Sequence, residues 1–218
     1  MFRPSNPQRA ILPPQLWRLR PFQLVVIDLY DWLFPWVIIN LLWVLCSLTV
    51  VLLPPATGAL FQTAQRAYRN QPPDPRRFMQ DLRVWFSDGW LWALPNVALF
   101  GGLFLLGRAL APAEIPLAVL GVVATLSIML QFFFWPYMML QEQPALLRAW
   151  RNSAFTALGD LLYAGLYLAF SLFVLVTSIV VVAPLVLITP VLLAMTATYG
   201  LAAWLEHHKL LDGDPRQL

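Results

Sequence analysis

Five polar side chains stand inside long apolar stretches of this sequence, and their types could do chemistry there. They are Asn40, Ser47, Asn96, Gln131 and Asp160. Amides, hydroxyls and a carboxylate in apolar surroundings either line a path for a solute or hydrogen-bond neighbouring helices. We favour the packing role for the set. Ser153 is a reasonable N-cap, and it would place Asp160 two turns into a helix, near headgroup depth.

The residue sets of the common catalytic and cofactor sites do not occur in the sequence. His207 and His208 are adjacent, so on a helix their side chains diverge, and Cys46 is the only cysteine. There is no Ser-His-Asp set, no phosphate-binding glycine motif and no close pair of intramembrane carboxylates. We therefore expect a protein that is not an enzyme, with no metal and no cofactor.

The composition indicates that lipid is the solvent for most of the chain. Hydrophobic residues make up 60% of the 218 positions, charged residues make up 11%, and the mean hydropathy is +0.67. The basic residues flank the apolar runs instead of forming one face, which argues against binding to nucleic acid. The fold class expected is all-α: a polytopic, multi-pass membrane helix bundle whose main partner is the lipid bilayer.

The apolar runs predict about five transmembrane helices. They are expected at about 32–53, 89–110, 115–137, 158–182 and 185–205, in a bundle of residues 22–206 between a polar arm (1–21) and a C-terminal tail (207–218). No charged residue lies between Leu161 and Leu205, and one helix of that length would be roughly twice the hydrocarbon thickness. The chain is therefore expected to turn near Pro184.

The segment between the first two spans reads as a pair of helices lying at the membrane surface, 55–70 and 75–87. Proline suits the first turn of a helix, so Pro55 can open the first, and Asp74 can cap the second. In the second helix the apolar residues recur at helical spacing on one side and the basic residues lie on the other side, which is typical of an interfacial amphipathic helix. Its candidate interfacial surface consists of Arg76, Arg77, Phe78, Leu82, Arg83 and Trp85.

The distribution of basic residues bears on orientation. A cytoplasmic 54–88 loop, with the N-terminus outside, puts most of the basic residues inside, but four arginines in the N-terminal arm oppose it. If the arm stays inside, the first span must be re-entrant or the number of spans must change.

Three stretches together carry a resemblance to a known family. They are NLLWVLCSLTVVLLPPATGAL from Asn40, PDPRRFMQDLRVWF from Pro73, and WPYMMLQEQPALLRAWRNSA from Trp135. With them the chain resembles the YesL-like family of bacterial integral membrane proteins of unknown function, although Thr49 stands where that family usually has proline. The resemblance implies a protein of the bacterial cytoplasmic (inner) membrane, from a family often encoded beside sugar-uptake ABC transporters.

Two functions from different classes remain open. The first is an accessory or scaffold component of a sugar-uptake transport system, which contacts an ABC-type sugar permease or forms a homo-oligomer. The alternative is a small transporter or channel whose polar path is lined by Asn40, Asn96, Gln131 and Asp160. An inverted repeat would require a second copy of the opening motif, and none is found, so we favour the scaffold.

Overall fold

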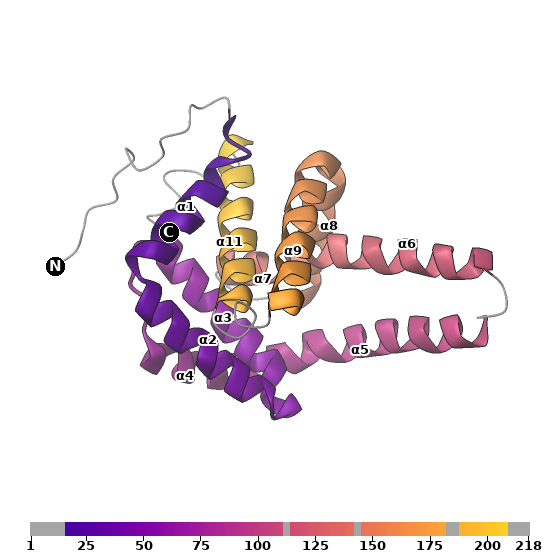
Figure 1. Cartoon of the computed structure of the whole chain (residues 1–218), viewed down its shortest axis with the longest axis horizontal. Helices are drawn as coiled ribbons and strands as arrows, with labels where there is room; N and C mark the ends of the chain where they lie inside the picture. Colours follow the sequence, from indigo (N-terminus) through magenta and orange to yellow (C-terminus); the bar gives the residue numbers. More distant parts are fainter. Residues whose placement is uncertain (1–15, 111–113, 142–144, 182–187, 209–218) are drawn as a thin grey trace.

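The computed structural model describes residues 16–110, 114–141, 145–181 and 188–208, and within these ranges the chain is helical without any strand (Figure 1). The elements are α1 (Arg20–Asp31), α2 (Leu33–Ser47), the 3-10 turn η3 (Val50–Leu52), α3 (Leu53–Tyr68), α4 (Pro75–Val84), α5 (Phe86–Ala109), α6 (Glu114–Gln131), α7 (Phe134–Leu140), α8 (Leu146–Gly159), α9 (Leu161–Val181) and α11 (Thr189–His207). The predicted all-α class is confirmed for the described residues.

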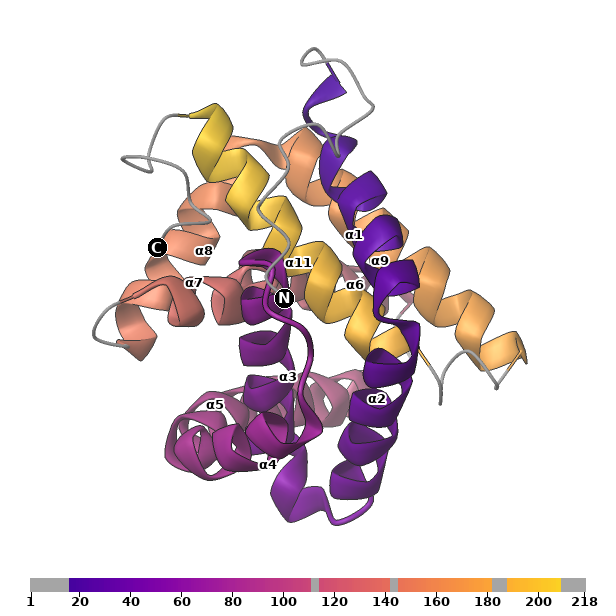
Figure 2. The same ribbon diagram turned by 90° about the vertical axis from the view of Figure 1, so that its left-hand side faces the viewer.

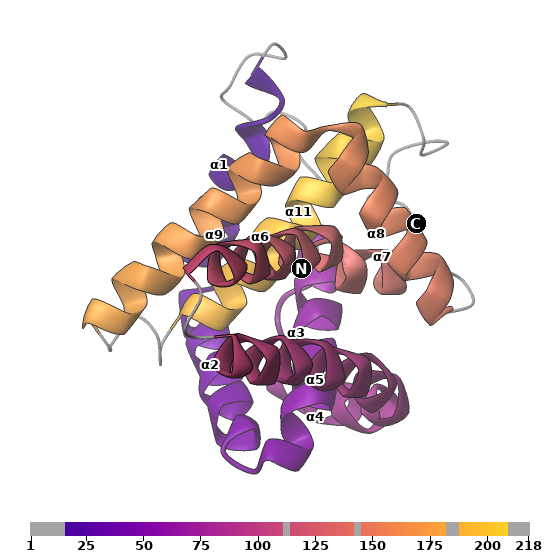
Figure 3. The same cartoon turned by 90° about the vertical axis from the view of Figure 1, so that its right-hand side faces the viewer.

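Helices α5 and α6 lie antiparallel and project from a body that the other helices form (Figure 1). Only Gly89 and Ala93, near its start, are buried residues of α5. Figure 3 shows the hairpin of α5 and α6 nearly end-on, with α9 running across its direction. The long apolar helices therefore do not all run along one common direction.

Three helices are long and apolar enough to cross a membrane. They are Phe86–Ala109, the segment Ala118–Leu140 that joins α6 to α7, and Leu161–Ser178. The pair α1 and α2 is a fourth candidate if it counts as one span, although it bends by 95°. A count of three or four fits an integral membrane protein, and the predicted number of five is not confirmed.

Helix α11 forms the centre of the body. It packs against α1, α2, α3 and α9, and most of its residues are buried by these neighbours. Small residues such as Ala194, Ala197 and Ala202 allow this close approach. The span expected at 185–205 is thus a helix that begins at Thr189 and faces mainly protein, while Pro184, the expected turn, lies outside the described residues.

The first span was expected to be one continuous helix over 32–53, and this expectation is wrong. Helix α2 ends at Ser47, and after η3 the chain starts α3 at Leu53, with prolines in its first turn. The Ser47 hydroxyl donates to the Trp43 carbonyl at 2.7 Å, and the Thr49 hydroxyl donates to the Cys46 carbonyl at 2.7 Å. Such side-chain bonds compete with the helical ladder at the end of α2.

The helix expected to begin at about residue 158 is also corrected. Helix α9 begins at Leu161, and the preceding residues form a separate helix, α8. Asp160 stands at the break between the two, and Ser153, expected as an N-cap, lies inside α8.

The two expected helices after the double proline are present as α3 and α4. Helix α3 ends where Asn70 takes a positive φ of 58°, with Asn70 N–H bonded to the Ala67 carbonyl and Gln71 N–H to the Arg66 carbonyl. This pattern is the Schellman motif, and asparagine tolerates its left-handed position. The predicted N-cap of α4 is confirmed, since the Asp74 carboxylate accepts a bond from the Arg76 N–H at 2.8 Å.

Candidate functional site

The polar residues singled out by the sequence lie at separate places in the structure: on α2, on α5, at the end of α6 and at the break before α9. Asn40, on α2, is fully buried, and its Oδ1 accepts a hydrogen bond from the Val191 N–H at 3.3 Å. Val191 belongs to the first turn of α11, whose amides have no partner within their own helix. Asn40 therefore caps α11 from a neighbouring helix.

Two of the other candidates bond to carbonyls of their own helices. Ser47 bonds to Trp43, and the Asn96 Nδ2 donates to the Trp92 carbonyl at 2.8 Å. Gln131 is half-buried and is the last residue of α6. These contacts satisfy polar groups locally and do not bring the three side chains toward a common point.

Asp160 caps α9 and holds the segment before α1. Its Oδ1 accepts a bond from the Tyr163 N–H at 3.0 Å, and its Oδ2 lies 3.0 Å from the Arg18 guanidinium. The Asp160 side chain is 15% exposed and that of Arg18 is 43% exposed. The carboxylate thus has a helix-capping role and an ion-pair partner, and Trp17, next to that partner, stacks on His207 at the end of α11.

Sequence reasoning missed the role of Ser153. Its hydroxyl donates to the Leu130 carbonyl at 2.6 Å and accepts from the Phe133 N–H at 3.2 Å. These two backbone groups flank the break between α6 and α7, so Ser153 satisfies the backbone where the helical ladder is interrupted. A serine in the middle of an otherwise helical stretch was the signal, but its partner lies on another helix.

Asp28, on α1, is another polar residue that joins two helices. It is 7% exposed, and its carboxylate accepts a bond from the Tyr199 hydroxyl at 2.6 Å. Tyr199 in turn packs edge-on against Tyr68. The contact ties α1 to α11 inside the body.

The candidate interfacial surface on α4 divides into two sides. Phe78, Leu82 and Trp85 are 0%, 7% and 6% exposed, and they belong to the hydrophobic core of the protein. The expectation that they rest on the bilayer is therefore wrong, because α3, α2 and α5 already cover this side (Figure 2). The remaining members, Arg76, Arg77 and Arg83, are exposed.

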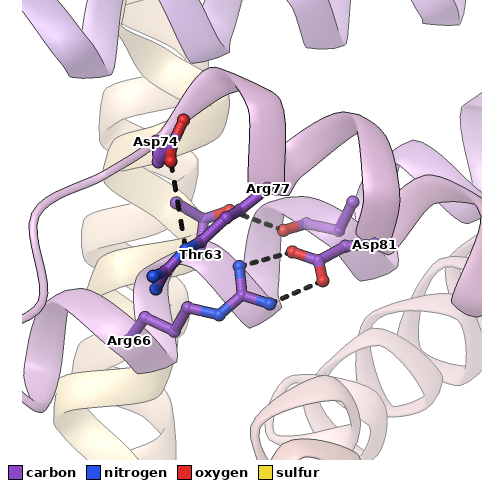
Figure 4. A network of polar contacts seen from close by, with 6 residues as sticks. Thr63, Arg66, Asp74, Arg77 and Asp81 are labelled. Carbon is purple, nitrogen blue, oxygen red and sulfur yellow. Dashed lines mark hydrogen bonds and ion pairs between the residues drawn. The ribbon is translucent and has the colours of Figure 1, made fainter.

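Polar contacts hold α4 onto α3 (Figure 4). The Arg66 guanidinium on α3 donates two hydrogen bonds to the Asp81 carboxylate on α4, at 2.5 and 2.6 Å. Within α4, Arg77 lies 3.9 Å from the N-cap residue Asp74. At the end of α3, burial lowers the pKa of the Arg69 guanidinium, which remains charged near neutral pH because its usual pKa is so high. The ion pair fixes the orientation of α4, and Arg76, Arg77 and Arg83 form its exposed basic face.

Within the described ranges, no group of three or more His, Cys, Asp or Glu side chains is placed to hold a metal ion. The expected absence of cofactors and enzymatic activity stays a prediction.

The fold and these contacts define a helical protein with three or four helices fit to span a membrane, in which polar side chains either bond within their own helix or join two helices. Residues 36–107 match the model of a family described as a protein of unknown function, DUF624. This match covers α2 to α5 and is consistent with the resemblance to the YesL-like family; it assigns no activity. No curated protein and no solved structure matches the chain.

Proposed function

We propose that the protein is an accessory or scaffold component of a membrane, which binds another membrane protein. The observation that carries this proposal is the use of its polar residues. Asn40 caps α11, Ser47 and Asn96 bond within their own helices, and Asp160 caps α9. A conducting path needs polar groups directed toward a common route, and these groups are already used in packing.

The exposed basic face of α4 is the surface we assign to the partner. Arg76, Arg77 and Arg83 project from a helix that its buried side and the Arg66–Asp81 ion pair hold firmly. Rigid support lets such charges select an acidic surface, since little ordering is left to be done on binding. The resemblance to the YesL-like family makes a sugar permease of the bacterial inner membrane the first partner to test.

The test is co-purification from native membranes. Replacing Arg76, Arg77 and Arg83 together by glutamine should weaken recovery of the permease. The matched control replaces Arg148 and Arg151, exposed arginines of α8, by glutamine and should leave recovery unchanged.

The alternative function predicts a different result. A transporter or channel would give saturable solute flux in liposomes that contain the purified protein alone, and Asp160→Asn would abolish it. Such flux, or equal recovery of the permease with both arginine variants, would overturn the scaffold proposal.

A further inference from the structure

The turn between α2 and α3 exposes a continuous apolar tip, residues 48–53. Leu48, Val50 and Val51 are 75%, 69% and 55% exposed, and no charged residue occurs between Asp31 and Arg66. Figure 2 shows α2 and α3 side by side, joined at the bottom of the view by this tip. Soluble monomers rarely expose a continuous apolar surface of this kind, and such surfaces mark sites that contact a membrane or another protein.

The length of α2 does not fit a crossing helix. It has 15 residues, which corresponds to about 22 Å at the usual rise per residue, against about 30 Å of hydrocarbon. The chain then reverses through η3 and returns along α3, which is mostly buried in protein. The hairpin thus has the form of a segment that enters a bilayer from one face and goes back to the same face.

Several polar groups of the tip have hydrogen-bond partners. Non-helical backbone is tolerated at membrane depth only where its polar groups find partners. The Thr49 hydroxyl bonds to the Cys46 carbonyl, and the Trp90 Nε1 donates to the Val51 carbonyl at 3.1 Å. Gly89, beside Trp90, lies directly against the backbone of Pro54. The tip is therefore continuous with the start of α5, one of the helices fit to cross the membrane.

The contact between Arg18 and Asp160 indicates on which face of the membrane the segment before α1 lies. When α5 and the segment 118–140 both cross, Asp160 returns to the face from which α5 started. Arg18 lies 3.0 Å from Asp160, so it shares that face. The chain between Arg18 and Phe86 must then cross an even number of times. Its one long uncharged stretch contains the hairpin of α2 and α3.

We infer that this hairpin inserts its tip into the hydrocarbon of the bilayer beside α5 and does not cross. With a hairpin that does not cross, the N-terminal segment and the basic loop 54–88 lie on the same side of the membrane, so their arginines no longer favour opposite orientations. Arg18 and Arg20 now share a face with the arginines of α3 and α4, as expected for the cytoplasmic side, where basic residues collect. The inference concerns topology and does not depend on the scaffold role.

Cysteine accessibility in sealed vesicles tests the topology in a Cys46→Ala background. An impermeant thiol reagent should label Leu16→Cys and Gln80→Cys from one face, and Ala109→Cys at the end of α5 from the opposite face. Labelling of Leu16→Cys and Gln80→Cys from opposite faces would show that the hairpin crosses. Labelling of all three from one face would mean that α5 does not cross the membrane, and this result would also overturn the inference.

Insertion of the tip is tested separately with a polarity-sensitive fluorophore on Val50→Cys in phosphatidylcholine–phosphatidylglycerol vesicles. Its emission should shift to the blue and be quenched by lipids spin-labelled on their acyl chains. Met79→Cys, on the exposed part of α4, serves as the control and should show neither effect. An emission spectrum at Val50→Cys that matches this control would refute insertion.

Discussion

The Asp81 carboxylate on α4 accepts two hydrogen bonds from the Arg66 guanidinium on α3, at 2.5 and 2.6 Å, with the side chains 10% and 22% exposed. The planar guanidinium matches a carboxylate in this two-bond geometry. Asp81→Asn leaves the Arg66 charge without its counterion. We expect the free energy of unfolding to fall by about 1.5–3 kcal/mol, the usual range for hydrogen bonds to charged groups. Thermal unfolding of the purified protein in detergent measures this.

Arg83→Gln provides the matched control on the same helix, since Arg83 is exposed. It should change the unfolding temperature little, because exposed surface charges contribute little to stability. Equal losses in Asp81→Asn and Arg83→Gln would mean that the ion pair does not hold α4 in place.

Asn40→Leu removes the acceptor that Asn40 offers to the Val191 N–H. Leaving a buried donor without a partner costs about 1–3 kcal/mol, so the unfolding temperature should drop. Ser47→Ala is the comparison, because the Ser47 hydroxyl bonds to a carbonyl of its own helix, and the change should be much smaller. A larger loss in Ser47→Ala would contradict the assignment of Asn40 as a cap.

Gly89→Ala tests the close packing of α5 on the double proline. A Cβ at this position would lie 2.8 Å from the Pro54 carbonyl carbon and 2.8 Å from the Pro55 nitrogen, which are backbone atoms that cannot rotate away. Overpacking of this kind costs about 1–3 kcal/mol. Gly101→Ala, on the same helix, meets no atom within 4 Å and should be neutral or stabilising. Equal thermal stability of both variants would argue against this contact.

Local patterns predicted the parts of the fold that depend on neighbours in sequence. Asp74 followed by Pro75 gave the start of α4, because a cap and its amide lie within one turn. The partner of Asn40 could not be found in this way, since Val191 lies on another helix, 151 positions further along. The end of α2 was missed because an unbroken apolar run looks the same whether it crosses or turns.

The error on α4 has a different origin. The spacing of Phe78, Leu82 and Trp85 correctly predicted one apolar side of a helix. The hydrophobic effect removes such a side from water equally well against lipid or against protein, so the sequence pattern does not distinguish the two. The basic side, in contrast, was predicted correctly as exposed at Arg76, Arg77 and Arg83.

Asp160 combines a helix cap with an ion pair, and two substitutions separate them. Asp160→Ala removes both and should lower the free energy of unfolding by about 1–2 kcal/mol, most of it from the cap, because Arg18 is 43% exposed and its pairing is screened. Asp160→Ser keeps a side-chain oxygen for the Tyr163 N–H and should recover most of the loss. Hydrogen exchange at the Tyr163 amide should be fast in the alanine variant and near the wild-type rate in the serine variant. If serine and alanine give the same exchange rate and the same stability, the cap contributes nothing measurable and Asp160 acts through Arg18 alone.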